Sequence, residues 1–185
     1  MKPRLPAALL AVVALAVPAL AQQPIDAGKS HIRFAFRQMN VPVEGRFRQF
    51  DAKVSFDPMR PESTQARFTV ELGSIDLGSA EGETEARRKP WLHVESFPTA
   101  TFVATKVRAT GAGKFEATGH LTIKGITQTL SAPFAVTDAG GTRTVEGRFP
   151  LERLQFKVGE GAWSDTETVA DEISVRFKFV IPLDP

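Results

Sequence analysis

The 185-residue chain contains no cysteine, no tyrosine and no block of like-charged residues. Without cysteine it can form no disulfide, no thiol nucleophile and no cysteine metal site, so its stability must depend on a hydrophobic core. The absence of a basic run gives no indication of a nucleic-acid or membrane-surface patch. Hydrolase templates fit poorly as well, because the chain has no G-x-S-x-G motif.

The first 21 residues have the pattern of a cleaved secretory signal. Two basic residues precede an apolar run from Ala7 to Leu20, and Ala19-Leu20-Ala21 supplies the small residues that a signal peptidase accepts. The run is shorter than the roughly 18 residues of a spanning helix, and Pro18 interrupts it, so a membrane anchor is not expected. We therefore expect residues 1–21 to be removed and residues 22–185 to form a single exported domain.

The remaining chain alternates between apolar and polar residues with a period of two, which is typical of strands with one buried face. Turn residues at 57–58, 111–113, 124–125 and 140–141 separate the alternating runs at hairpin spacing. Seven or eight strands without a βαβ repeat indicate a sandwich or a barrel. We favour an antiparallel barrel, because closing the sheet removes exposed edges. The clearest alternation involves Ile32, Phe34, Phe36, Phe50, Ala52, Val54, Phe56, Phe68, Val70, Leu121, Ile123, Val175, Phe177, Phe179 and Ile181.

One segment breaks this alternation and predicts a short helix over Ser79–Lys89. Its acidic residues come first and its basic residues last, which suits the helix dipole, and Glu83 and Arg87 have the i,i+4 spacing of an ion pair. Pro90 would end the helix. The insertion is either a lid over an opening of the barrel or a solvated connector.

Few residues suggest catalysis or metal binding. The three histidines fit no helical metal motif, so no metal ligand is predicted. The carboxylates between residues 165 and 172 could serve a paired-acid mechanism, but a solvated loop is the simpler interpretation. We therefore predict no catalytic residue. The residues concerned are His31, His93, His120, Asp165, Glu167, Asp171 and Glu172.

The aromatic residues are 14 phenylalanines and 2 tryptophans. Phenylalanine offers a large apolar surface without a hydrogen-bonding group, so an inner face lined with it would suit an alkyl or isoprenoid chain. The alternative is that these rings fill a solid core, because a barrel of about eight strands can be packed or can hold one ligand. The loop Gly159–Trp163 could cap such a pocket or simply turn the chain.

Five motifs, in order along the chain, resemble those of the YceI-like family. They extend from Pro24 to Ile181 and include a Phe-Pro-x-Ala-x-Phe core and a Gly-x-Leu-Thr-x-x-Gly-x-Thr hairpin. The matching segments are Pro24–Phe34, Val43–Pro58, Trp91–Phe102, Gly119–Thr127 and Phe156–Ile173.

The resemblance implies a lipocalin-like antiparallel barrel of about eight strands with one short helical insertion and an elongated apolar cavity. Members bind polyisoprenoids, isoprenoid quinones or other long-chain amphiphiles in the bacterial periplasm, without accepted catalytic residues or a cofactor. Some occur beside membrane b-type cytochromes. Many carry Arg-Asp and His-Leu before the Phe-Pro motif, where this chain has Arg87–Leu92, so head-group contacts do not transfer.

We therefore expect a periplasmic, non-enzymatic carrier of an amphiphilic lipid. A membrane b-type cytochrome and a second copy of the chain are the candidate protein partners. Two alternatives stay open: an enzyme that uses His93 or the acids near Asp165, and an interaction module with a packed barrel and an exposed apolar patch. The predicted ligand-binding residues are Phe34, Phe36, Phe56, Phe68, Val70, Trp91, Phe102, Leu121 and Phe156, with Arg87, His93 and Trp163 at the mouth.

Overall fold

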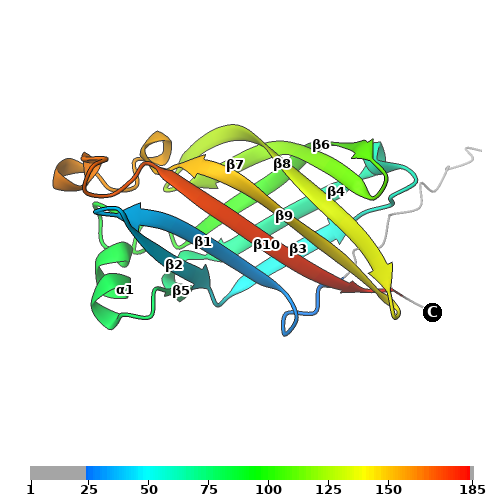
Figure 1. The fold of residues 1–185 in the computed structure, drawn as a ribbon, viewed down its shortest axis with the longest axis horizontal. Coiled ribbons are helices and arrows are strands. Elements are labelled where there is room, and N and C mark those ends of the chain that lie inside the picture. Colours follow the sequence, from blue (N-terminus) through cyan, green and yellow to red (C-terminus); the bar gives the residue numbers. More distant parts are fainter. Residues whose placement is uncertain (1–23, 184–185) are drawn as a thin grey trace, which may run out of the picture.

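The structure is a computed structural model that describes residues 24–183, so the signal predicted at residues 1–21 lies outside the described residues. It consists of a curled antiparallel sheet with one α-helix at its end (Figure 1). The predicted all-β barrel class is confirmed, with ten strands where seven or eight were expected. The elements are β1 (His31–Gln38), β2 (Val41–Phe47), β3 (Phe50–Ser55), η1 (Pro61–Ser63), β4 (Gln65–Glu71), η2 (Leu72–Ser74), β5 (Ile75–Asp76), α1 (Ala80–Arg87), β6 (Thr99–Gly111), β7 (Lys114–Ile123), β8 (Ile126–Ala139), β9 (Thr142–Glu152), η3 (Arg153–Phe156), η4 (Gly161–Ser164) and β10 (Glu172–Pro182).

Two continuous chain segments connect the first strands of the sheet to its last strands. Each segment places one strand at each end of the strand order, so the sheet must curl to bring its two ends close together. The strand order is β3-β4-β6-β7-β8-β9-β10-β1-β2-β5. Only residues 48–49 separate β2 from β3, and only η2 separates β4 from β5. The β3–β4 pair therefore starts the sheet and the β2–β5 pair completes it, so two bent segments connect its first and last strands.

A charged cluster holds this bend in place. Asp76 accepts hydrogen bonds from Arg46 Nε at 2.8 Å and from Arg48 Nε at 3.1 Å. The bond from Arg46 is the main reason why the pKa of the Asp76 carboxyl lies well below its usual value. Asp76 thus ties β5 to β2 at the point where the chain turns towards β3.

Two of the three hairpin turns with positive φ at both turn residues were predicted from their glycine residues. Lys124-Gly125 and Gly140-Gly141 connect β7–β8 and β8–β9, and all four residues have positive φ, as two-residue type I′ turns require. Met39 and Asn40 adopt the same geometry between β1 and β2. Methionine rarely marks such a turn, so this hairpin was not among the predicted turns.

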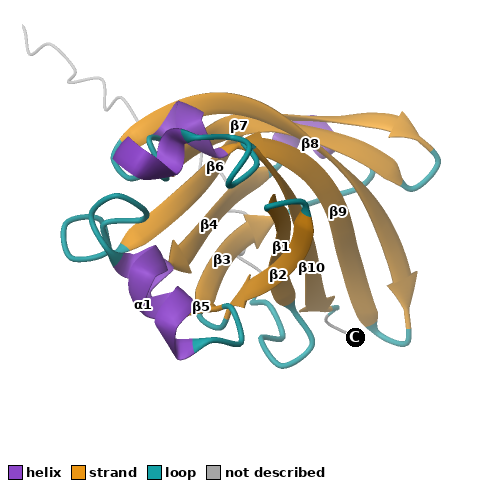
Figure 2. Ribbon diagram, turned by 60° about the vertical axis from the view of Figure 1, so that its left-hand side comes forward, coloured by secondary structure: helices purple, strands orange, loops and turns teal. Residues whose placement is uncertain are grey.

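The predicted helix is present as α1, and it ends before Pro90. Ser79 caps its first turn by accepting a hydrogen bond from Gly82 N at 3.3 Å. Glu83 and Arg87 form the expected ion pair at 3.4 Å. Figure 1 and Figure 2 show α1, η3 and η4 at the same end of the barrel.

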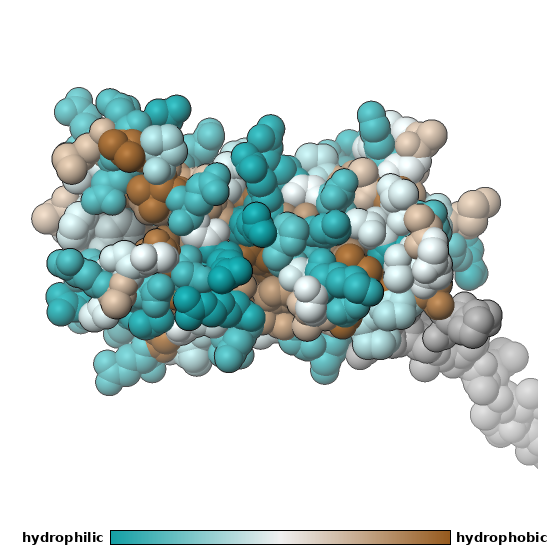
Figure 3. Space-filling view, turned by 60° about the horizontal axis from the view of Figure 1, so that its bottom comes forward, coloured by the Kyte–Doolittle hydropathy of each residue, from teal (hydrophilic) through white to brown (hydrophobic). Residues whose placement is uncertain are grey.

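Buried apolar residues form two clusters. One contains Leu72, Leu92 and Phe156 and lies near α1, and the other contains Val54, Phe56 and Phe115. The outward face in Figure 3 is mainly hydrophilic, with apolar side chains in small separate patches. The apolar surface is therefore concentrated inside the barrel.

Candidate functional site

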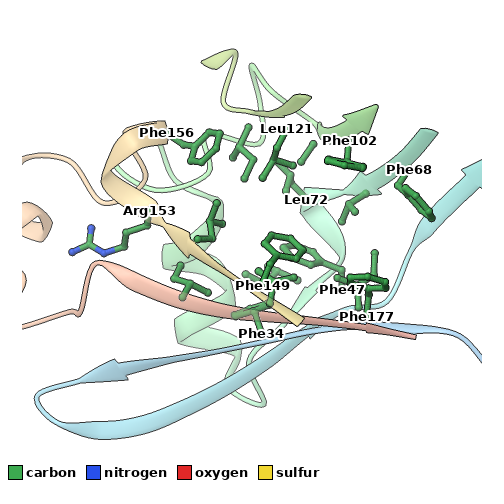
Figure 4. Close-up of a pocket in the computed structure, with 18 of the residues that line it drawn as sticks. Phe34, Phe47, Phe68, Leu72, Phe102, Leu121, Phe149, Arg153, Phe156 and Phe177 are labelled. Atoms are coloured by element: carbon green, nitrogen blue, oxygen red, sulfur yellow. The ribbon is translucent and has the colours of Figure 1, made fainter. Parts of the chain in front are cut away.

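A cavity of about 540 Å³ lies inside the barrel and reaches residues of both buried clusters. Its walls are apolar side chains from nearly every strand, several of which Figure 4 shows. The packed-barrel alternative is therefore wrong for this chain. The exceptions to the apolar lining are Gln38, Thr64, Ser79, Glu81, Glu85, Thr101 and Arg153.

The wall follows strand alternation, with one interruption. Even-numbered residues of β1 and odd-numbered residues of β10 face the cavity. On β6 the apolar lining residues are Ala100, Phe102 and Ala104, and then Val107, because a β-bulge between Ala104 and Lys106 shifts the alternation. Strand parity alone therefore identifies only part of this wall.

Glycines allow the aromatic rings to lie close to the wall. Phe34 pairs across the strands with Gly45, and Phe177 pairs with Gly147. A Cβ atom on Gly45 would lie 2.7 Å from Phe34 Cε2, and one on Gly147 would lie 2.6 Å from Phe177 Cζ. Each ring thus occupies the space that a side chain on the facing strand would take, which leaves room in the centre of the barrel.

We expect Gly45→Ala to narrow the cavity while the fold survives. The new methyl group meets only the ends of side chains, Phe34 and Leu77 Cδ2, and the Phe34 ring can move inwards. The displaced ring takes up part of the cavity, and losing about 1 kcal/mol of apolar contact should make a neutral fluorescent apolar probe bind roughly fivefold more weakly. Gly111→Ala is the control, because its Cβ would have only ordinary contacts of 3.9 Å. Equal probe affinity for both variants would contradict this account of the wall.

The mouth of the cavity lies between α1 and the loop that carries Trp163. Glu81, Glu85 and Trp163 line both the cavity and a separate outer depression of about 500 Å³. The ring centroids of Trp91 and Trp163 are 5.3 Å apart. The helix therefore borders the opening of the cavity, and its action as a lid stays a prediction.

A buried arginine organises the loop around this mouth. Arg153 is 1% exposed, and its guanidinium donates hydrogen bonds to the carbonyl oxygens of Val158, Gly159, Val169 and Ala170. It also lies 5.6 Å from the centre of the Trp91 ring. Burial lowers the pKa of this guanidinium. Arg153 thus joins η3 to the segments before and after η4.

The structure brings together ten of the twelve predicted site residues. The lining includes Phe34, Phe36, Phe56, Phe68, Val70, Trp91, Phe102, Leu121, Phe156 and Trp163. Their contact with a ligand stays a prediction.

Arg87 and His93 are not among the lining residues, contrary to their predicted place at the mouth. Arg87 donates to the carbonyl oxygens of Gly73 and Ile75, at 3.1 and 3.4 Å. His93 is hydrogen-bonded to Ser96 Oγ at 3.0 Å and packs against Phe97. Both residues therefore support the chain around α1.

Sequence reasoning missed several lining residues, among them Phe47, Leu72, Phe149, Phe177 and Phe179. The alternation on β10 did identify Phe177 and Phe179 as residues on one face. The missing information was which face points inwards, and only the pairing of β10 with β1 and β9 supplies it.

The titratable residues considered for chemistry lie apart from the cavity. Asp165 accepts hydrogen bonds from Thr168 Oγ1 and Glu167 N, and the bond from Thr168 is the main reason for its lowered pKa. Asp171 accepts from Leu154 N at 2.9 Å. Both acids thus shape loops. Within residues 24–183, no group of three or more histidine and acidic side chains is arranged to hold a metal ion.

None of the helices between residues 24 and 183 has the length and apolar character needed to cross a bilayer.

Comparison with solved structures identifies close relatives of this fold. The crystal structure of Burkholderia cenocepacia BcnA has a TM-score of 0.82 and 39% identity, covering 84% of this chain and 98% of that one. A polyisoprenoid binding domain from Saccharophagus degradans has a TM-score of 0.69, covering 90% of this chain and all of that one. Because the latter is only 12% identical, its likeness concerns the fold alone.

Sequence comparison gives a consistent result. A UPF0312 protein of Ectopseudomonas mendocina is 33% identical over 138 residues, which cover 71% of this chain and 72% of that protein. The family model of the YceI-like domain matches residues 24–181, which is nearly all of the chain that the structure describes. The chain therefore belongs to the YceI-like family.

Proposed function

We propose that this protein is an exported, non-enzymatic carrier that holds a long-chain amphiphile in its barrel. The observation that carries the proposal is a cavity of about 540 Å³ whose wall is apolar and whose acidic groups, Glu81 and Glu85, come from the helix at its mouth. This volume lies within the range of about 300–1,000 Å³ that is typical of small-molecule sites. The polyisoprenoid binding domain from Saccharophagus degradans supplies the first candidate ligand class, an isoprenoid chain.

The energetics favour a long apolar chain as the bound group. Burying one CH₂ group gains about 0.8 kcal/mol, so eight such groups contribute roughly 6 kcal/mol before the costs of association. Binding therefore does not require many polar contacts. A polyisoprenoid, an isoprenoid quinone or a fatty acid derivative would each supply such a chain.

The residues that an enzyme would need are used elsewhere. His93 and Asp165 form local hydrogen bonds and do not line the cavity, which supports binding over catalysis. As exchange partners in the periplasm we propose a membrane b-type cytochrome or a second copy of the chain. Met39 and Val41, which are 68% and 61% exposed, offer apolar contact surface at the tip of the β1–β2 hairpin.

Mass spectrometry of the protein purified gently from its own periplasm tests the proposal. The intact complex and a solvent extract should contain one stoichiometric species with an isoprenoid or acyl mass. The same preparation shows whether residues 1–21 have been removed. An empty protein that also fails to bind added quinones, polyprenyl lipids and fatty acids would overturn the carrier function.

A further inference from the structure

We infer that the mouth of the cavity selects an uncharged, hydroxyl-bearing head group over an anionic one. The inference rests on the proposed function, because it concerns the polar end of a ligand whose chain lies in the barrel. It follows from three features of the mouth: two carboxylates, a buried hydrogen-bond donor without a partner, and two arginines that are already bonded to other groups.

The carboxylates belong to α1 and border the path of the ligand. Glu81 and Glu85 are one helical turn apart, so they share a face of the helix, and both line the cavity and the outer depression. Within residues 24–183, Glu81 has no ion pair, and Glu85 is paired with Arg88 at 3.1 Å. An ionised carboxylate accepts hydrogen bonds and repels another anion, so this rim favours a head group that can donate.

The donor without a partner is the indole Nε1 of Trp91. This nitrogen is buried, and no acceptor for it exists among the described residues. Buried N–H groups without partners are rare and costly, so an acceptor oxygen brought by a ligand would stabilise the site. Because neighbouring atoms cover the nitrogen, the head group must displace a side chain to reach it. Trp163 is the side chain that we expect to be displaced. Its ring centroid lies 5.3 Å from that of Trp91, and it lines both the cavity and the outer depression.

The two arginines that line the cavity or the outer depression are bonded to other groups. The guanidinium of Arg153 donates to four backbone carbonyls and points away from the other lining side chains (Figure 4). Arg88 is held by Glu85. Among the described residues that line the cavity and the outer depression, a phosphate or carboxylate head group would thus meet two acids and no unpaired cation. A hydroxyl group fits better, because it can accept from Trp91 and donate to a carboxylate.

The experiment compares ligands that share a tail and differ in the head: dodecanol, dodecylamine and dodecyl phosphate. Each competes with a neutral fluorescent apolar probe, at low salt and below its critical micelle concentration. We expect dodecanol to bind more tightly than dodecyl phosphate. In E81Q/E85Q, Arg88 loses its partner, so dodecyl phosphate should gain about two- to fivefold in affinity, while dodecylamine loses a similar factor. Trp91→Phe should weaken dodecanol about threefold and leave dodecylamine unchanged, because an ammonium group accepts no hydrogen bond.

E44Q/E62Q is the matched control, since it removes two exposed carboxylates that do not line the cavity or the depression. Dodecylamine is the internal control for Trp91→Phe, because an ammonium group accepts no hydrogen bond from the indole. Tighter binding of dodecyl phosphate than of dodecanol, or an unchanged phosphate-to-amine ratio in E81Q/E85Q, would overturn the selectivity. Failure of all three compounds and of the probe to bind would instead overturn the carrier function itself.

Discussion

We expect Phe102→Asp to abolish lipid loading while the empty barrel still folds. Phe102 lies on the cavity wall next to Phe68, at 6.4 Å between ring centroids, and contacts the aromatic row that continues to Phe179. In the empty protein, water in the cavity can hydrate the new carboxylate. A bound chain expels that water, and an uncompensated buried charge costs several kcal/mol. A loss of about 3 kcal/mol corresponds to roughly 150-fold weaker binding of the neutral probe.

Two variants of the same strand show whether the charge in the cavity is responsible. Val103 is the next residue on β6 and points to the opposite face, so Val103→Asp should bind normally. Phe102→Leu keeps the wall apolar and should bind within a few-fold of the natural protein. Because burial raises the pKa of a carboxyl group, binding to Phe102→Asp should partly recover at low pH. Undiminished loading of a well-folded Phe102→Asp protein would exclude Phe102 from the site. Phe68→Asp provides an independent repeat.

The strands that were predictable are those with large apolar residues in alternation. On β10, Val175, Phe177 and Phe179 share one parity, and the pattern is unambiguous. The strand β6 was not predicted because threonine and alanine occupy many of its positions, and β2 and β9 were not predicted because proline and glycine interrupt their alternation. In β2 and β9 the wall needs Gly45 and Gly147 for the facing phenylalanines, so the residues that form the cavity weaken the strand signal.

The apolar character of the site was predictable from the sequence, but the set of residues that line it was predictable only in part. Phenylalanine content indicated an apolar lining, yet alternation could not tell the inner face from the outer one. The bulge after Ala104 also changes which residues of β6 face inwards, and no sequence pattern marks it. Arg153 is the clearest failure, because a charged residue in a loop is normally exposed. Its partners are backbone carbonyl groups up to 17 residues further along the chain. Every residue has such a group, so the sequence cannot indicate which of them bind the arginine.

We expect Arg153→Met to be among the most destabilising single substitutions in the barrel. Methionine fills a similar volume but leaves the four carbonyl oxygens bound by Arg153 without donors in a buried site. Breaking such a buried charged network costs about 3 to 5 kcal/mol. At the lower value, the melting temperature of a domain of this size should fall by roughly 6 to 12 °C. Urea denaturation followed by circular dichroism would measure the loss directly.

Arg108→Met is the matched control, because Arg108 is 56% exposed and donates only to Glu116 on the neighbouring strand. An exposed pair of this kind contributes at most about 1 kcal/mol. Gly159→Ala should also lower the stability of the protein by disturbing the same hydrogen bonds. Gly159 has a φ of +86°, and its added Cβ would overlap the Arg153 guanidinium. Hydrogen exchange should then increase in residues 158–170 in both variants, because these backbone segments depend on the same guanidinium. A loss of stability for Arg153→Met no larger than that for Arg108→Met would show that the mouth loop is held by its apolar contacts instead.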